Sequence, residues 1–161
     1  MTRPLASDIH LRAATSTDAS AVHALLSAAK LPLAGLPDDL AHFFVAERAA
    51  RIVGAIGLER FGDAALLRSA VVHPDLRGMG VGEALTRALI SHAEANRVRE
   101  LVLLTETAAD WFPRFGFTRI TRADAPAAVQ ASLEFTAACP ASAIVMSRRL
   151  ASTAAATEQH P

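Results

Sequence analysis

The sequence predicts a mixed α/β domain in which helices flank a mainly antiparallel sheet. Three runs of β-forming apolar residues, joined by short polar turns, predict a meander of strands between residues 42 and 72. Apolar residues at helical spacing before and after the meander predict helices that pack on this sheet. The chain has 161 residues, which is enough for one compact core. We therefore expect a single domain over residues 1–150 and a loose tail over 151–161, which has no large apolar residue to bury.

The first half of the chain begins with a strand and a helix. The segment IHLRAA (9–14) alternates as a strand does, and cap-forming residues from Thr15 to Asp18 open an amphipathic helix. The segment LPLAGLPDDL (31–40) contains too many prolines and glycines for one regular element, so it predicts a loop. The meander follows as HFFVAE, RIVGAIGLERF and ALLRSAVV, with Gly62-Asp63 turning the chain before the third strand.

The second half continues to alternate between helices and strands. Apolar residues from Val81 to Ala93 form one stripe on a helix, and the apolar run RELVLLTE predicts a strand covered on both faces. The segment TAADWFPRFG predicts a short helix that Pro113 interrupts and Gly116 ends. The closing strands are FTRI and SAIVMSRRL, with a partly helical segment over 125–142 between them.

Charge and composition exclude several classes of function. The chain has 16 basic and 16 acidic residues, so no net field attracts nucleic acid or an anionic membrane. The first residues lack the apolar core of a signal peptide, and no apolar run approaches the ~18 residues that span a bilayer. Six histidines and one cysteine show no metal-ligand spacing. We therefore expect a cytoplasmic protein with no metal, no nucleic-acid partner and no membrane partner.

Three glycines alternate with single residues where the striped helix begins, in VVHPDLRGMGVGEALTRAL. A dinucleotide-binding loop requires a glycine at the sixth position counted from Gly78, and that position is Glu83. A nucleotidase-type phosphate loop requires a lysine, and this stretch contains none. Successive backbone N–H groups can converge at the helix N-terminus, where the helix dipole favours an anion. The stretch therefore predicts a phosphate-bearing ligand, with a turn used only for packing as the alternative.

Arg77, Gly80 and Gly82 match the pattern Arg/Gln-x-x-Gly-x-Gly/Ala between a strand and a helix. On these residues the chain resembles the GNAT superfamily of acyl-CoA-dependent N-acyltransferases, whose order of elements fits residues 8–150. Three longer segments, LERFGDAALLRSAVV, LVLLTETAADWFPRFGF and EFTAACPASAIVM, are similar to the branch of GNAT proteins encoded with arsenic-resistance functions. The family's downstream pattern Asn-x-x-Ala…Tyr…Gly-Phe aligns, with departures at the first and third positions, on Thr105, Ala108, Phe112 and Gly116-Phe117.

The resemblance implies a sheet that splays open to admit acetyl-CoA, the acetyl donor. The donor's pyrophosphate is then expected on the N–H groups of the glycine loop, and its pantetheine arm beside the preceding strand, to which it adds like another strand. A backbone N–H near Val71 is expected to stabilise the oxyanion of the reaction. The residues implied in donor binding are Ala70, Val71, Val72, Arg77, Gly78, Met79, Gly80, Val81, Gly82 and Glu83.

Transfer to an amine requires that the amine lose a proton, and Glu59 and Glu106 are the candidate bases. Each has a structural alternative, because Glu59 can pair with Arg68 or Arg60 and Glu106 can serve the first turn of the next helix. Family members usually supply a tyrosine as the acid for the departing thiolate. Phe112 occupies the matching position and the chain contains no tyrosine, so the group that protonates the thiolate stays open.

Arg68 lies in an otherwise apolar strand, where a guanidinium must be paired. Its partner is either Glu59 or an oxyanion of the substrate, and Ser69 and Cys139 are further substrate-binding candidates, with a small buried apolar role as the alternative for Cys139. We expect an N-acetyltransferase that acts on the amine of a small amino-acid-like molecule, and the arsenic-associated resemblance implies resistance to arsenic or to a toxic analogue. The alternatives are a non-catalytic acyl-CoA-binding sensor and a peptide N-terminal acetyltransferase. A homodimer is also open.

Overall fold

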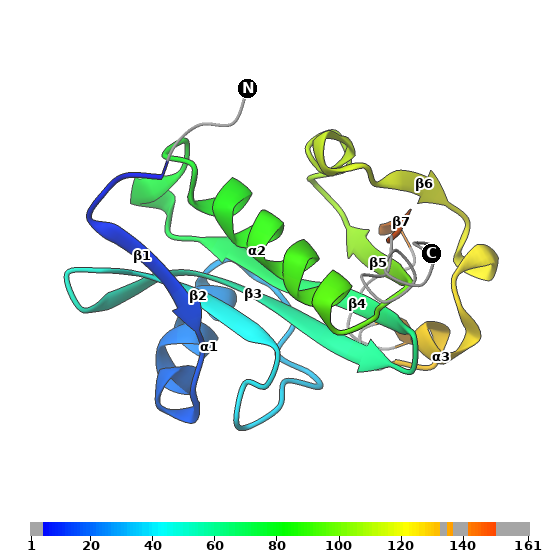
Figure 1. The fold of residues 1–161 in the computed structure, drawn as a ribbon, viewed down its shortest axis with the longest axis horizontal. Helices are drawn as coiled ribbons and strands as arrows, with labels where there is room; N and C mark the ends of the chain where they lie inside the picture. The colour runs from blue at the N-terminus through cyan, green and yellow to red at the C-terminus, as the bar shows by residue number, and fades with distance from the viewer. Residues whose placement is uncertain (1–4, 133–134, 137–141, 151–161) are drawn as a thin grey trace, which may run out of the picture. The chain divides into compact units, whose positions relative to one another are not determined.

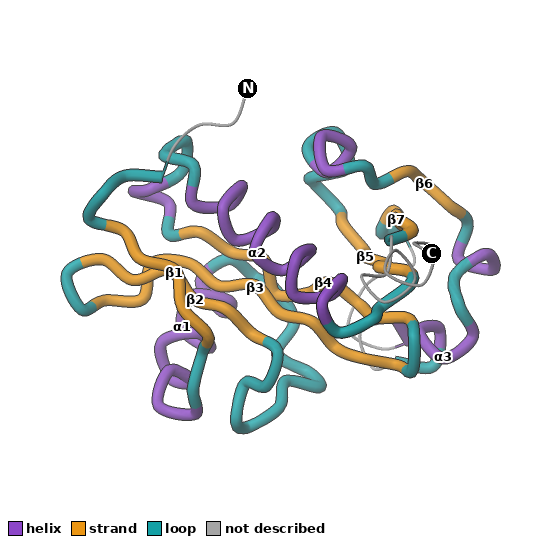
Figure 2. Tube along the Cα trace, in the orientation of Figure 1, coloured by secondary structure: helices purple, strands orange, loops and turns teal. Residues whose placement is uncertain are grey.

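The computed structural model describes residues 5–132, 135–136 and 142–150 and shows a mixed α/β fold (Figure 1). The strands are β1 (Ile9–Ala13), β2 (Phe43–Arg48), β3 (Arg51–Phe61), β4 (Ala64–Val72), β5 (Glu100–Thr105), β6 (Thr118–Ile120) and β7 (Ile144–Arg149), and the helices are α1 (Ala19–Ala28), α2 (Val81–Ala95) and α3 (Ala127–Gln130). The strand order is β1-β2-β3-β4-β5-β7-β6, and Figure 2 separates these strands from helices and loops by colour. The pair β4–β5 is parallel, whereas β1–β2, β2–β3, β5–β7 and β6–β7 are antiparallel. The predicted fold class is therefore confirmed.

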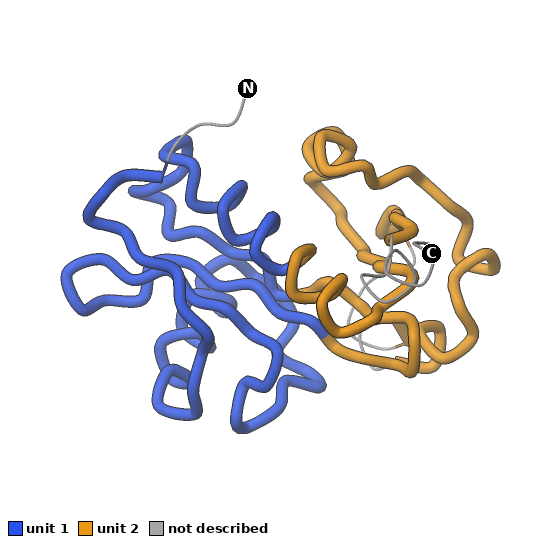
Figure 3. The backbone as a smooth tube through the Cα atoms, viewed as in Figure 1, with its two compact units in different colours: residues 1–58, 69–89 blue, residues 59–68, 90–161 orange. Residues whose placement is uncertain are grey.

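The contacts of the chain form two compact units, which Figure 3 shows in different colours. Unit 1 contains Met1–Leu58 and Ser69–Leu89, and unit 2 contains Glu59–Arg68 and Ile90–Pro161. Each unit has a cluster of buried apolar residues of its own. The expected tail over 151–161 lies outside the described residues.

One face of the strands of unit 1 packs against α1. Val22 and Leu26 are fully buried and contact a cluster that includes Val45, Ala55 and Val71 from β2, β3 and β4. Residues four positions apart lie on the same side of a helix, so one apolar stripe of α1 covers this face.

The opposite face of the same strands packs against the start of α2. Gly54 precedes Ala55 in β3, and consecutive residues of a strand point to opposite faces of a sheet. A Cβ on Gly54 would lie 3.1 Å from both Val81 and Leu85, so the absence of a side chain lets α2 approach closely. Within unit 1, α1 and the first half of α2 thus cover opposite faces (Figure 1).

Unit 2 is built around the buried strand β5. Leu101, Val102 and Leu103 are each at most 1% exposed, which confirms the prediction of a strand covered on both faces. The first residues of β4, Ala64–Leu66, pair in parallel with β5, and β7 pairs along the other edge of β5. Helix α3 lies in the segment predicted to be partly helical.

The helix predicted in TAADWFPRFG is shorter than expected. Within this segment the structure forms a 3-10 helix over Phe112–Phe115, and Gly116 ends it with a φ of 86°, as predicted. Pro113 does not interrupt a helix, because it lies in the first turn, where no backbone N–H donor is needed. The chain before this turn is held by Thr105, whose Oγ1 accepts a hydrogen bond from the Ala108 N–H at 2.9 Å.

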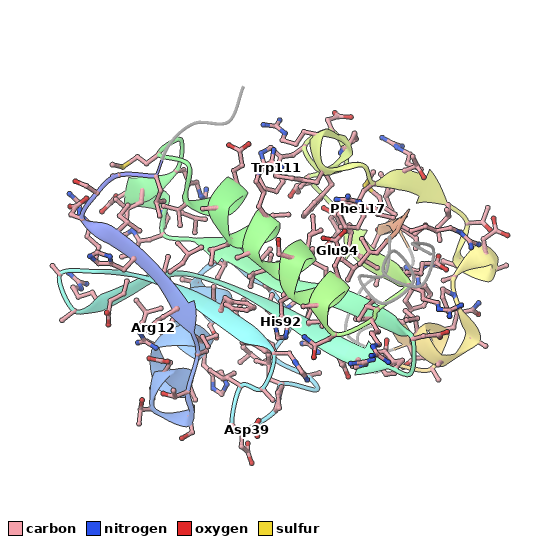
Figure 4. All side chains as sticks on the ribbon, in the orientation of Figure 1. Arg12, Asp39, His92, Glu94, Trp111 and Phe117 are labelled. Atoms are coloured by element: carbon pink, nitrogen blue, oxygen red, sulfur yellow. The ribbon has the colours of Figure 1, made fainter. Side chains whose placement is uncertain are left out.

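An ion pair joins β1 to the start of α1. Both terminal nitrogens of Arg12, labelled in Figure 4, donate to the Asp18 carboxylate at 2.8 Å. The Thr15 N–H donates to the same carboxylate at 2.8 Å, and Glu47 of β2 accepts from Arg12 at 3.4 Å. The Asp18 side chain is 7% exposed. Because Arg12 hydrogen-bonds to the charged form of this carboxylate, the pKa of Asp18 falls from 3.8 to about 2.

We expect Asp18→Asn to lower the free energy of unfolding at pH 7 by about 2 kcal/mol. The pKa of Asp18 is lower in the folded state than in the unfolded state, so its contribution is present above 3.8 and is lost as the pH falls toward about 2. Denaturant titrations of the wild type and of Asp18→Asn, at pH 7 and at about pH 2.5, measure this difference in the free energy of unfolding. The difference should shrink at the lower pH, which lies between the unfolded-state and folded-state pKa values of Asp18.

The control for this measurement is Asp63→Asn. The Asp63 side chain is 73% exposed and lies 4.0 Å from Arg99, and an exposed pair of this kind contributes at most about 1 kcal/mol. Equal losses of stability in the two variants would contradict a special role for the pair between Arg12 and Asp18.

Candidate functional site

The connection between β4 and α2 is a tight, locally capped loop in unit 1. The strand ends at Val72, and His73 Nδ1 accepts a hydrogen bond from the Asp75 N–H at 3.1 Å. This contact caps the turn that ends the strand. A 3-10 turn over Pro74–Leu76 follows, and Leu76 is 6% exposed, so the loop is anchored in the core before the glycines begin.

Positions 78 and 80 require glycine because of their backbone conformation. Both have a φ of 83°, in the left-handed region that residues with a Cβ rarely adopt. Gly82 lies inside the first turn of α2, where Thr86 Oγ1 donates a hydrogen bond to its carbonyl at 2.8 Å. The alternating glycines therefore have distinct roles, with two of them turning the chain and the third lying in the helix.

The start of α2 presents backbone donors without internal acceptors. The Ala84 N–H donates to the Gly80 carbonyl at 3.0 Å, so Val81 and Gly82 lie before the first N–H that finds an acceptor at the start of the helix. In the described part of the chain, no recorded hydrogen bond uses the N–H of Gly78 or Gly80. These donors and the positive end of the helix dipole make the loop suited to bind an anion.

The charged side chains beside the loop do not oppose an anion there. Glu83 pairs with Arg87 one turn further along α2, with a nitrogen–oxygen distance of 3.2 Å. Arg77 is exposed, and Met79 is half-buried. The Glu83 carboxylate is thus balanced by a cation, and a second cation, Arg77, precedes the glycines.

The last residues of β4 expose backbone beside this loop. Ala70 is exposed, whereas Ser69 and Val71 on either side of it are each 7% exposed. Ser69 has a φ of 60°, which breaks the regular alternation of the strand, and no pattern in the sequence signals this conformation. The recorded pairing of β4 with β5 covers only Ala64–Leu66, so it leaves the segment from Ala70 to Val72 outside that ladder.

In unit 2, the structure brings together Arg68 and Glu59. Arg68 Nη1 donates to Glu59 Oε1 at 3.1 Å, and the side chains of Arg68 and Glu59 are 1% and 26% exposed. The structural partner expected for Arg68 is therefore present. The same contact gives Glu59 the alternative role foreseen for it.

Of the other residues predicted for the site, Glu106 forms no ion pair in the described part of the chain. Glu106 is exposed just beyond β5, and Thr105 rather than Glu106 accepts the hydrogen bond from the Ala108 N–H. Phe112 is 6% exposed, and its ring centroid lies 5.0 Å from that of Trp111 and 5.8 Å from that of Phe117, so this position has a core role. Cys139 lies outside the described residues.

Among the described residues, no helix has the length and apolar character needed to cross a bilayer. The same residues contain no group of three or more histidine, cysteine, aspartate or glutamate side chains arranged to hold a metal ion.

Known structures with a similar fold include several acetyltransferases. N-acetylglutamate synthase from Neisseria gonorrhoeae, solved with coenzyme A and N-acetyl-glutamate, is 21% identical with a TM-score of 0.76, and the match covers 91% of this chain and 36% of that one. Rv2747 from Mycobacterium tuberculosis, solved with CoA, is 23% identical with a TM-score of 0.76 and coverages of 88% and 99%. A GNAT acetyltransferase from Staphylococcus aureus is 18% identical, with a TM-score of 0.72 and coverages of 89% and 99%. The chain spans about a third of the length of the Neisseria synthase.

At these identities the structural matches establish the fold, and the sequence establishes the family. No protein with a curated function matches the sequence. The model of the acetyltransferase (GNAT) domain matches residues 39–119, just over half of the chain, and this range includes the glycine loop and the pair formed by Arg68 and Glu59. The prediction of a GNAT acetyltransferase domain is confirmed. The chain belongs to the acetyltransferase (GNAT) family, whose enzymes take their acetyl group from acetyl-CoA.

Proposed function

We propose that this protein transfers the acetyl group of acetyl-CoA to the amine of a small amino-acid-like molecule, by direct attack when donor and acceptor are both bound. The observation that carries the proposal is the set of backbone N–H groups of Gly78, Gly80, Val81 and Gly82 at the start of α2, for which the described part of the chain shows no acceptor. Phosphate is the anion that such a helix start favours, and the donor carries a pyrophosphate.

The residues predicted to bind the donor fit it in character. Within the stretch from Gly78 to Glu83, the N–H groups of the three glycines and of Val81 would hold the pyrophosphate. The backbone from Ala70 to Val72 would pair with the amides of pantetheine as one strand pairs with another. Side chains contribute little there, because Ala70 is small and the glycines have none. When bound, acetyl-CoA supplies a thioester carbonyl that a neutral amine can attack.

The chain must also remove a proton from the amine. Glu106 is exposed at the end of β5 and can pass the proton to solvent directly or through water. Glu59 is partly exposed, and its carboxylate accepts a hydrogen bond from Arg68. Phe112 offers no proton to the departing thiolate, and the proposal needs none, because a thiolate leaves without assistance.

Arg68 supports an acceptor that carries a carboxylate or a similar oxyanion. The Arg68 guanidinium is 1% exposed, so water competes little with a ligand for its N–H groups. A guanidinium can also hold two oxygen atoms of a carboxylate in a fixed geometry. The acceptor carboxylate would share this group with Glu59, and Ser69 follows Arg68 directly in the strand. The Neisseria synthase, whose structure contains N-acetyl-glutamate, is a precedent for an amino-acid ligand on this fold.

Narrower expectations belong to this proposal as well. They are a role in resistance to arsenic or to a toxic glutamate analogue, a cytoplasmic location, a homodimer, and a single domain over residues 1–150, and all of them rest on the sequence.

A second candidate function, an acyl-CoA sensor without catalysis, is favoured by one observation, which is the phenylalanine at position 112.

We expect Gly80→Val to weaken acetyl-CoA binding by at least about tenfold, because a β-branched side chain disfavours the left-handed backbone and occupies the space of the phosphate. Calorimetric titration measures the affinity. The control is Gly62→Val, because Gly62 also has a positive φ, of 68°, but lies in the turn between β3 and β4 with nothing within 4 Å of its added Cβ. Wild-type affinity in the Gly80 variant would place the donor elsewhere.

We expect Glu106→Gln or Glu59→Gln to lower kcat by about 10²-fold, with acetyl-CoA affinity unchanged, for whichever residue is the base. The control is Glu100→Gln at the opposite end of β5, which should keep full activity. Because Glu59 pairs with Arg68, the melting temperature of its variant must be measured alongside. Full activity in both variants would mean that solvent alone accepts the proton.

We expect thiol release from acetyl-CoA to be faster with amino acids such as glutamate than with the corresponding carboxamides. In Arg68→Lys, KM should rise at least about tenfold for the acids and much less for the carboxamides, because lysine cannot hold a carboxylate in the same two-point geometry. Equal effects on both acceptors, with a lowered melting temperature, would leave Arg68 as the structural partner of Glu59. Thiol release that never exceeds the control without acceptor would favour the sensor.

A further inference from the structure

Unit 1 contains a cavity of about 750 Å³ whose lining, apart from Val71, Val72 and Arg77, takes no part in the predicted functions. One wall is α1, through Ala21, Ala24 and Ala28, whose small side chains leave the space open. Leu25 on the same helix also lines it, and so does Ile52 of β3. The volume lies within the range of small-molecule sites.

The cavity lies on the opposite face of the strands from the donor loop. Val71, which lines it, belongs to the apolar cluster packed against α1. The start of α2, with its open N–H groups, packs on the other face, against Gly54. Val71 and Val72, whose backbone is expected to pair with the donor, and the short connection from His73 to Arg77 border both regions. A ligand in the cavity can therefore be bound together with one on the loop.

The charged groups in the cavity lining that have no partner are cations. Three arginines and three carboxylates line the cavity, and Arg12 pairs with both Asp18 and Glu47. Arg51 and Arg77 also line it, and among the described residues neither guanidinium has a hydrogen bond or ion pair. The remaining acid is Asp75, whose side chain is 87% exposed and is 3.8 Å from His73. An anionic ligand can therefore contact Arg51 and Arg77 without breaking an ion pair of the described residues.

We propose that this cavity is a second ligand site, which binds a small organic carboxylate with an apolar body. The apolar body lies against α1, Ile52 and Val71, and the carboxylate is held by Arg51 and Arg77 at the rim. Burial of the apolar body contributes binding energy that grows with the size of the ligand. The guanidinium groups make binding depend on a negative charge. The site would let the protein respond to a carboxylate that is not its acetyl acceptor.

Calorimetric titration with butyrate, hexanoate and octanoate tests the proposal, with hexanamide as the neutral match for hexanoate. Hexanoate should bind at least about tenfold more tightly than hexanamide, and Arg51→Gln should remove most of that difference. Ala28→Leu should also weaken hexanoate by at least about tenfold, because the larger side chain fills the cavity. The matched control is Ser27→Leu, which adds the same residue at the neighbouring exposed position outside the cavity and should bind hexanoate as the wild type does.

Three outcomes would overturn the proposal. The first is the absence of binding by any of the carboxylates. The second is unchanged hexanoate affinity in both Arg51→Gln and Ala28→Leu, with melting temperatures that show folded proteins. The third is complete displacement of hexanoate by acetyl-CoA, which would make the cavity part of the donor site. Acetyl-CoA titration of the same variants distinguishes these outcomes from a failure of the proposed function, because Arg51 and Ala28 take no part in donor binding.

Discussion

The function of this chain depends on how it passes from β4 into α2. Most helices begin after a serine, threonine, aspartate or asparagine that accepts a hydrogen bond from the first N–H groups. Here Gly80 precedes Val81, so no side chain at that position satisfies the donors. The left-handed backbone at Gly78 and Gly80 turns the chain sharply enough to leave the helix start open. Packing of Val81 and Leu85 beside Gly54 then holds these donors in a fixed direction.

The buried charged side chains Asp18 and Arg68 each form an ion pair, whereas the unpaired cations discussed above are exposed. Asp18 is held by Arg12 and by a backbone amide, and Arg68 is held by Glu59. Removing one partner from such a pair leaves an uncompensated charge in a poorly solvated place, so these residues depend on each other. Arg51 and Arg77, by contrast, are exposed and unpaired among the described residues. Free cations of this kind are the ones that a ligand can recruit without breaking an existing contact.

Aromatic packing explains what Phe112 does in place of a proton donor. Its ring packs edge-on against Trp111 and Phe117, and the ring of Trp111 also lies 4.8 Å from that of Phe115. A tyrosine hydroxyl at this buried position would need a hydrogen-bond partner, whereas a phenylalanine ring needs only apolar neighbours. Position 112 therefore stabilises the turn before β6. A phenylalanine at this position cannot donate a proton, so the proposed reaction assigns no acid to it.

The sequence by itself determined the features that depend on neighbouring residues. Periodicity predicts the order of strands and helices, and the glycines before Val81 predict an anion site, because backbone preference and helix polarity act over a few positions. The tertiary structure decided the rest. It alone shows that Glu59 is the partner of Arg68, that Ser69 takes a positive φ within β4, and that a cavity lies between α1 and the strands. These features depend on how distant segments align and pack, and local residue patterns carry little information about such alignment.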